Sequence, residues 1–101
     1  MPALYLDHAA STPLRPGVAE AIAPWLSGAN PSSMHRPGRA ARKALEDARD
    51  RVASLLGAPP REVCFCSGGT EADNLAVLGA AHGRGMVTCA TEHPAVLLPA
   101  L

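Results

Sequence analysis

A pair of glycines stands between a predicted strand and a predicted helix in Ser67-Gly68-Gly69-Thr70-Glu71-Ala72-Asp73-Asn74. Glycines let backbone amides converge on one point, and the start of a helix carries a partial positive charge. These amides and the Thr70 hydroxyl could therefore hold a phosphate. An ordinary strand-to-helix turn, capped by Thr70 or Ser67, explains the same pattern about equally well. The spacing fits neither of the glycine fingerprints of nucleotide-binding loops.

The segments around this turn predict an α/β fold. The short apolar run Glu62–Cys66 precedes the glycines as a strand, the helix continues to about Ala81, and Met86–Ala90 forms a second strand. A strand, a crossover helix and a second strand make the unit of a parallel sheet. We therefore expect a parallel or mixed sheet flanked by helices.

Before this unit, the sequence predicts one more strand, two helices and a loop. The strand is Leu4–Leu6, and the loop, rich in Asn, Pro, Ser and Gly, is Gly28–Gly38. Apolar residues at helical spacing predict helices over Val18–Leu26 and Arg39–Leu56, the second with Gly57 as its stop. The expected apolar face of the second helix consists of Ala41, Ala44, Leu45, Ala48, Val52, Leu55 and Leu56.

His93 follows the second predicted strand in Thr91-Glu92-His93-Pro94. It is expected at the carboxyl edge of the sheet, together with the glycine turn, and ligands bind at that edge in open α/β sheets. There an imidazole can stack on a ring or move a proton. The alternative is a histidine of a surface loop or a neighbour of a helix cap. His8 and His35 lie in polar loops, where solvent exposure is the simpler interpretation.

The composition is typical of a small neutral domain. Apolar residues make up 48% of the 101 residues, and nine Lys plus Arg balance nine Asp plus Glu, so no overall field attracts nucleic acid or anionic lipid. The sequence shows neither a secretion signal nor a membrane-spanning window, so the expected location is the cytoplasm. Cys64, Cys66 and Cys89 are expected to be reduced and packed in the core, and no metal site is expected.

Four segments, in order, resemble the cysteine desulfurases of the class V aminotransferase group. They are similar to that family's opening strand, its substrate-side loop with the following helix, its phosphate loop and its ring-stacking segment, and they span Tyr5–Pro13, Asn30–Arg42, Phe65–Asn74 and Thr91–Val96. The resemblance implies the N-terminal part of a fold type I large domain that binds pyridoxal 5'-phosphate. It divides the chain into an N-terminal arm and helix (1–28) and a loop, long helix and incomplete cofactor domain (29–101).

The resemblance also implies the roles of single residues. Gly69 and Thr70 hold the cofactor phosphate, and His93 is the catalytic residue that stacks over the pyridine ring and relays a proton. Asn74 supports the phosphate loop from the helix behind it, and Gly69 stands where many relatives have alanine. The implied reaction removes sulfur from L-cysteine, giving L-alanine and an enzyme-bound persulfide for iron-sulfur cluster or thiocofactor biosynthesis. The implied partners are a second copy of the chain, in a homodimer, and a sulfur acceptor or iron-sulfur scaffold protein.

The chain departs from the family pattern in one important respect. Lys43, its only lysine, lies on the solvent face of a predicted helix and matches no part of the family's cofactor-binding lysine segment. We therefore expect this chain alone to be inactive, and we expect further chain after the apolar stretch Val96–Ala100. Two alternatives remain. One is a short, non-catalytic relative that acts as a binding protein, and the other is a class V enzyme such as a selenocysteine lyase or an aminotransferase.

Overall fold

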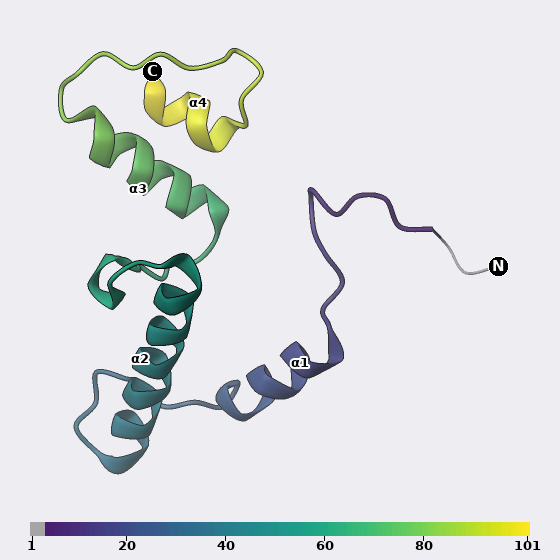
Figure 1. The fold of residues 1–101 in the computed structure, drawn as a ribbon, viewed down its shortest axis with the longest axis vertical. Coiled ribbons are helices and arrows are strands. Elements are labelled where there is room, and N and C mark those ends of the chain that lie inside the picture. Colours follow the sequence, from purple (N-terminus) through teal and green to yellow (C-terminus); the bar gives the residue numbers. More distant parts are fainter. Residues whose placement is uncertain (1–3) are drawn as a thin grey trace. The chain divides into compact units, whose positions relative to one another are not determined.

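The computed structural model describes residues 4–101, and its regular structure is helical (Figure 1). The α-helices are α1 (Pro16–Ile22), α2 (Arg36–Leu56), α3 (Gly69–Ala81) and α4 (Pro94–Ala100). Two short 3-10 helices, η1 (Ala23–Trp25) and η2 (Pro60–Glu62), complete the set. The chain separates into two compact units, of which the first ends at Pro60 and the second spans Arg61–Leu101. The division at residue 28 that the resemblance implies stays a prediction.

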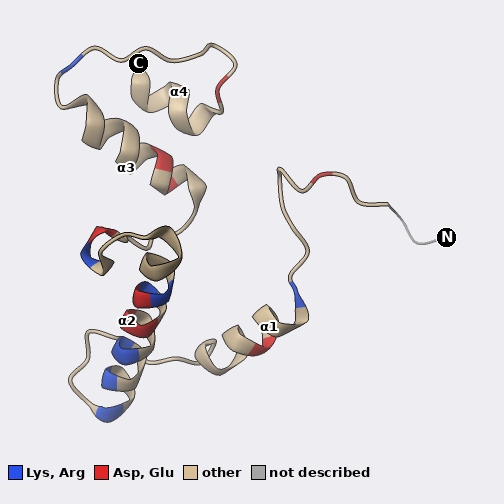
Figure 2. Ribbon diagram, viewed as in Figure 1, with Lys and Arg blue, Asp and Glu red and all other residues tan. Residues whose placement is uncertain are grey.

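The long helix of the first unit, α2, confirms the predicted helix and begins three residues before it. His35 caps its start, because the imidazole Nδ1 accepts a hydrogen bond from the Gly38 amide at 3.1 Å. Gly57 ends it in the left-handed conformation, with φ 66°, which glycine adopts at little cost. Charged residues lie along α2 from Arg36 to Arg51 (Figure 2), including the Lys43–Asp47 ion pair at 2.6 Å.

One part of the predicted apolar face of α2 is wrong. The middle turns of α2 line a cavity of about 760 Å³ together with Trp25, through Ala41, Ala44, Leu45, Ala48 and Val52. Leu55 and Leu56 lie outside this cavity and are 88% and 70% exposed. The preceding helix is also shorter than predicted: α1 ends at Ile22 and continues as η1, because Pro24 has no N–H to extend the α-helical hydrogen bonds.

The second unit is built on the packing of α3 against α4, which lie side by side (Figure 1). The predicted helix after the glycine pair is confirmed as α3. The segment after His93, for which only an apolar stretch was predicted, is a helix, α4. Ala95, in the first turn of α4, is 5% exposed and is one of the two buried hydrophobic residues of the described chain.

The three predicted strands are wrong for this chain, since no strand occurs among residues 4–101. Glu62 ends η2, and the remaining residues of the predicted strands are irregular. A helix completes its hydrogen bonds within consecutive residues, whereas a strand needs partners, and two strands without a covering layer are marginal in water. No covering layer is present on these segments, where Val87 is 100% and Phe65 44% exposed.

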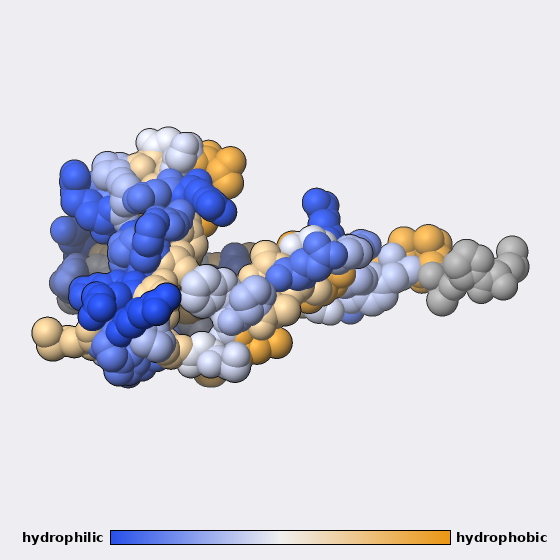
Figure 3. Space-filling view, turned by 90° about the horizontal axis from the view of Figure 1, so that it is seen from below, coloured by the Kyte–Doolittle hydropathy of each residue, from blue (hydrophilic) through white to orange (hydrophobic). Residues whose placement is uncertain are grey.

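The cysteines correct another expectation. Cys64, Cys66 and Cys89 are exposed, because they lie on segments that do not become covered strands. Hydrophobic residues reach the surface elsewhere as well (Figure 3). Leu4, Leu26 and Leu98 are among the large hydrophobic residues that are exposed. None of the described helices combines the length and apolar composition needed to cross a bilayer. In residues 4–101, no group of three or more His, Cys, Asp or Glu side chains is arranged to hold a metal ion.

Candidate functional site

The first turn of α3 has backbone amides that can bind an anion. Gly68 is the N-cap in extended backbone, and no side chain caps this end of the helix. The Gly68 carbonyl accepts a hydrogen bond from the Ala72 amide at 3.1 Å, which closes the turn. The amides of Gly69 and Thr70 belong to the first turn, whose N–H groups find no acceptor inside an α-helix. With the helix dipole, these donors are chemically suited to a phosphate.

The space around both glycines is open. No heavy atom lies within 4 Å of a Cβ placed on Gly68 or Gly69. Gly69 is the first helical residue and does not have positive φ, so alanine would fit its backbone and its surroundings. The amide of residue 69, and not the absence of its side chain, is therefore the feature that an anion would use.

Ser67, which precedes α3, is hydrogen-bonded to Glu71 in the first turn of the helix. Oε2 of Glu71 accepts two hydrogen bonds of 2.6 Å, one from the Ser67 hydroxyl and one from the Ser67 amide. These bonds, first the hydroxyl and then the amide, lower the pKa of Glu71 below its ordinary value, because they stabilise the charged carboxylate. Both donors of Ser67 are thus already occupied, and Gly69 and Thr70 are among the donors at the start of α3 that remain for a ligand.

The substitution Ser67→Ala is expected to raise the pKa of Glu71 toward its ordinary value, since it removes the larger of the two bonds. Because the folded pKa is lowered, the Ser67–Glu71 contact stabilises the turn above the ordinary carboxyl range, about pH 4.3, and is lost as pH falls through the folded pKa. Carbon-13 NMR of the Glu71 carboxyl group between about pH 2.5 and 6.5 measures the shift. Ser54→Ala, in α2, is the control, and an unchanged Glu71 titration in Ser67→Ala would contradict the contact.

His93 lies at the start of α4 and caps it. Its Nδ1 accepts a hydrogen bond from the Ala95 amide at 3.1 Å, and Pro94 occupies the first turn, where its missing N–H has no cost. An imidazole nitrogen that accepts carries no proton, so the proton of the neutral ring is on Nε2. The ring is exposed, so Nε2 remains available to a ligand or a proton.

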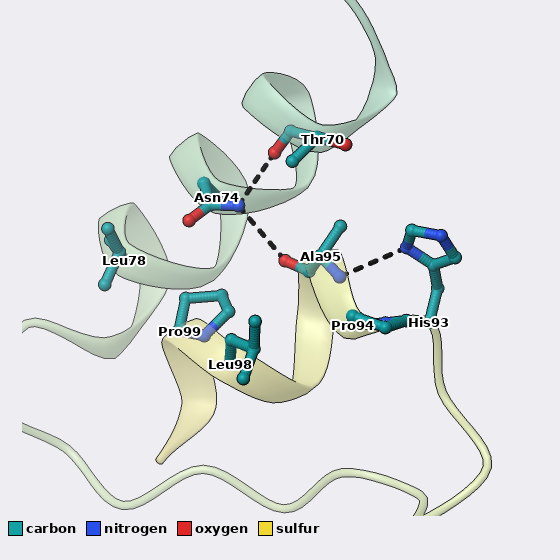
Figure 4. Close-up of a pocket in the computed structure, with 8 residues that line it drawn as sticks. All are labelled: Thr70, Asn74, Leu78, His93, Pro94, Ala95, Leu98 and Pro99. Carbon is teal, nitrogen blue, oxygen red and sulfur yellow. Dashed lines mark hydrogen bonds between the residues drawn. The ribbon is translucent and has the colours of Figure 1, made fainter.

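Thr70 and His93, which are 23 positions apart in the sequence, line one cavity of about 630 Å³ (Figure 4). The sequence-predicted threonine and histidine are thus brought together. Gly69 adjoins Thr70 but is not among the residues that line the cavity, which are Thr70, Asn74, Leu78, His93, Pro94, Ala95, Leu98 and Pro99. Its walls are mostly apolar, and the volume is in the range of small-molecule and cofactor sites.

Two features of this cavity were not predicted from the sequence. Leu98 and Pro99 form part of its wall because the segment after His93 is helical. The signal was present, since a capping residue followed by proline is a common helix start. The second feature is a hydrogen-bonded link between the two helices: Nδ2 of Asn74 donates to the carbonyl of Thr70 at 2.8 Å and to that of Ala95 at 3.2 Å.

The residues of the cavity fit pyridoxal phosphate in their chemistry. First-turn amides and a hydroxyl suit its phosphate, and a flat imidazole with apolar neighbours suits its ring. No lysine lines the cavity to bind the cofactor covalently, and Lys43 belongs to the first unit, where its side chain is 75% exposed and paired with Asp47.

Comparison with known proteins points to the same group of enzymes. The family model for aminotransferase class V matches residues 4–101. The chain is similar to the cysteine desulfurase IscS of Dictyoglomus turgidum, with 47% identity over 95% of the chain and 26% of the relative. It is 49% identical to the IscS-like cysteine desulfurase of Mycobacterium tuberculosis, over 92% of the chain and 26% of the relative.

A third relative, a cysteine desulfurase of Frankia sp., is 52% identical over 93% of the chain and 24% of the relative. The chain therefore spans about a quarter of the length of the curated relatives it matches. No solved structure matches it. Because the family model covers nearly all of the sequence, from residue 4 to residue 101, the chain belongs to the class V aminotransferase family.

Proposed function

We propose that these residues are the N-terminal part of a pyridoxal-phosphate-dependent cysteine desulfurase. The observation that carries the proposal is the cavity in which Thr70, at the start of α3, and His93, at the start of α4, lie together. The names of the similar proteins add support, since they are cysteine desulfurases. The family itself has the fold type I of pyridoxal-phosphate enzymes.

In this proposal, each residue at the site has a distinct task. The amides of Gly69 and Thr70 and the Thr70 hydroxyl bind the phosphate, helped by the dipole of α3. The ring of His93 stacks on the pyridine ring and moves a proton through Nε2, while its Nδ1 stays bonded to the Ala95 amide. When bound, pyridoxal phosphate supplies an electron sink for bond cleavage at the substrate.

The remaining features of the proposal concern the complete protein. L-cysteine loses its sulfur to an enzyme thiol, which becomes a persulfide, and the carbon skeleton leaves as L-alanine. Segments 63–66 and 86–90, most of whose residues are exposed, join a parallel or mixed sheet only when further strands and helices cover them. We further propose a homodimer in the cytoplasm that passes sulfur to an acceptor or to an iron-sulfur scaffold protein.

The complete product of the gene, supplied with pyridoxal phosphate, L-cysteine and a thiol reductant, is expected to release alanine and sulfide in equal amounts. The reductant frees the persulfide sulfur, so the enzyme turns over repeatedly. Parallel reactions with L-selenocysteine, and with an amino acid and a 2-oxo acid, test the two other enzyme activities of this family. A higher kcat/KM for selenocysteine, or formation of an amino acid from the oxo acid, would contradict the proposal.

A further inference from the structure

The side-chain amide of Asn74 connects the two helices of the candidate site. Asn74 is half-buried in α3, and its Nδ2 donates both of its side-chain hydrogen bonds. One bond, to the carbonyl of Thr70 at 2.8 Å, stays within α3. The other, to the carbonyl of Ala95 at 3.2 Å, crosses 21 positions of sequence to α4 (Figure 4). An amide NH₂ has two protons, so both are used.

Ala95 is hydrogen-bonded both to Asn74 and to His93. Its carbonyl accepts from Asn74, and its amide donates to Nδ1 of His93 at 3.1 Å. Ala95 is also 5% exposed, so packing limits its movement. The orientation of the His93 ring therefore depends on the place of one buried residue, and Asn74 holds that residue against α3.

We infer that Asn74 is a positioning residue, which holds the His93 ring in register with the phosphate-binding turn through Ala95. The inference rests on the proposed function, because it matters for the reaction only if His93 meets the cofactor. Asn74 also lines the cavity, but in this scheme it acts through Ala95 and His93. Its two acceptors are the carbonyl of the residue proposed to bind the phosphate and the carbonyl of the residue that fixes the histidine.

The first unit of the same chain contains a matched control. His35 caps α2 as His93 caps α4, with the Gly38 amide 3.1 Å from its Nδ1. This second cap consists of His35 and Gly38 only and includes no bond to Asn74. A change that acts through Asn74 should therefore alter the cap of His93 and leave the cap of His35 intact.

The test is an NMR measurement on the nitrogen-15-labelled complete protein without cofactor. A scalar coupling between an amide nitrogen and an imidazole nitrogen is observed only when an N–H···N hydrogen bond joins them. We expect this coupling for Ala95 with His93 and for Gly38 with His35. In Asn74→Asp, whose carboxylate has nearly the same shape but cannot donate, the first coupling is expected to disappear and the second to stay. Asn74→Ala, which adds no charge, is expected to give the same result.

Three outcomes would overturn the inference. They are the absence of the Ala95–His93 coupling in the unaltered chain, its persistence in Asn74→Ala, and its loss together with the helical carbon-13 shifts of α3. The last outcome would make Asn74 a residue of general helix stability. The measurement involves no cofactor, so it is independent of turnover. A complete protein without desulfurase activity, whose His93 coupling still depends on Asn74, would contradict the proposed function alone.

Discussion

The chain of 101 residues, tested alone with pyridoxal phosphate and L-cysteine, is expected to release no alanine or sulfide above a control with cofactor only. Enzymes of this cofactor class use a lysine amine at the site to bind the cofactor covalently. The cavity of Thr70 and His93 has no lysine in its lining, and Lys43 is paired with Asp47 on the exposed face of α2. The whole enzymatic acceleration, typically a factor of about a million or more, should therefore be missing.

The matched control for this experiment is Lys43→Ala in the same chain, assayed for alanine and sulfide beside the unaltered sequence. We expect the two to be indistinguishable, since an exposed ion pair with the side chain four residues along the helix contributes little to structure. Alanine release that is present in the unaltered chain and absent in Lys43→Ala would contradict the prediction and would make Lys43 the cofactor-binding residue.

Helices α1, α2 and α3 were predictable from the sequence because each completes its backbone hydrogen bonds locally, whereas α4 was not predicted. In α2, apolar spacing gives the helix, and Gly57 ends it with a left-handed residue. In α3, the start at the glycine pair was predicted, and the helix ends at Ala81, followed by the C-cap residue His82 in the left-handed conformation with φ 33°. Local rules of this kind need no knowledge of the rest of the fold.

The strands were not predictable in the same way, because a strand depends on residues distant in sequence. The chain exposes 8574 Å², whereas about 5,400 Å² is typical of a folded monomer of 10.4 kDa. Apolar side chains such as Val87 are consequently fully exposed. The alternating and apolar patterns indicate which residues prefer a covered sheet, but they cannot supply the partners that cover it.

The candidate site was predicted in part. Gly69, Thr70 and His93 were the predicted site residues, and the structure brings Thr70 and His93 to one cavity by the packing of α3 against α4. That convergence was expected from a shared sheet edge, yet here it is produced by two helices. The alternative for His93, a neighbour of a helix cap, came close to its position, since the residue is itself the cap of α4. Capping and catalysis use different ring nitrogens and are therefore compatible.

His93→Asn in the complete protein is expected to lower kcat for L-cysteine by about 100-fold or more, the usual contribution of a positioned acid–base group. Asparagine is a preferred N-cap residue, so its side-chain oxygen can replace Nδ1 as the acceptor for the Ala95 amide. The substitution thus removes the ring and its Nε2 but keeps the cap of α4. The loss of kcat would then result from removal of the imidazole and not from disorder of α4.

Two further variants serve as comparisons for His93→Asn. His82→Asn, at the left-handed end of α3, is a histidine change outside the cavity that asparagine tolerates, and it should leave kcat unchanged. Thr70→Ala should chiefly weaken cofactor affinity, measured by titration with pyridoxal phosphate, because it removes a phosphate donor and no proton carrier. If His93→Asn instead keeps kcat within about threefold of the unaltered enzyme, which is far below the effect of an acid–base group, then His93 acts only as the cap of α4. The proton must in that case pass through another residue of the complete protein.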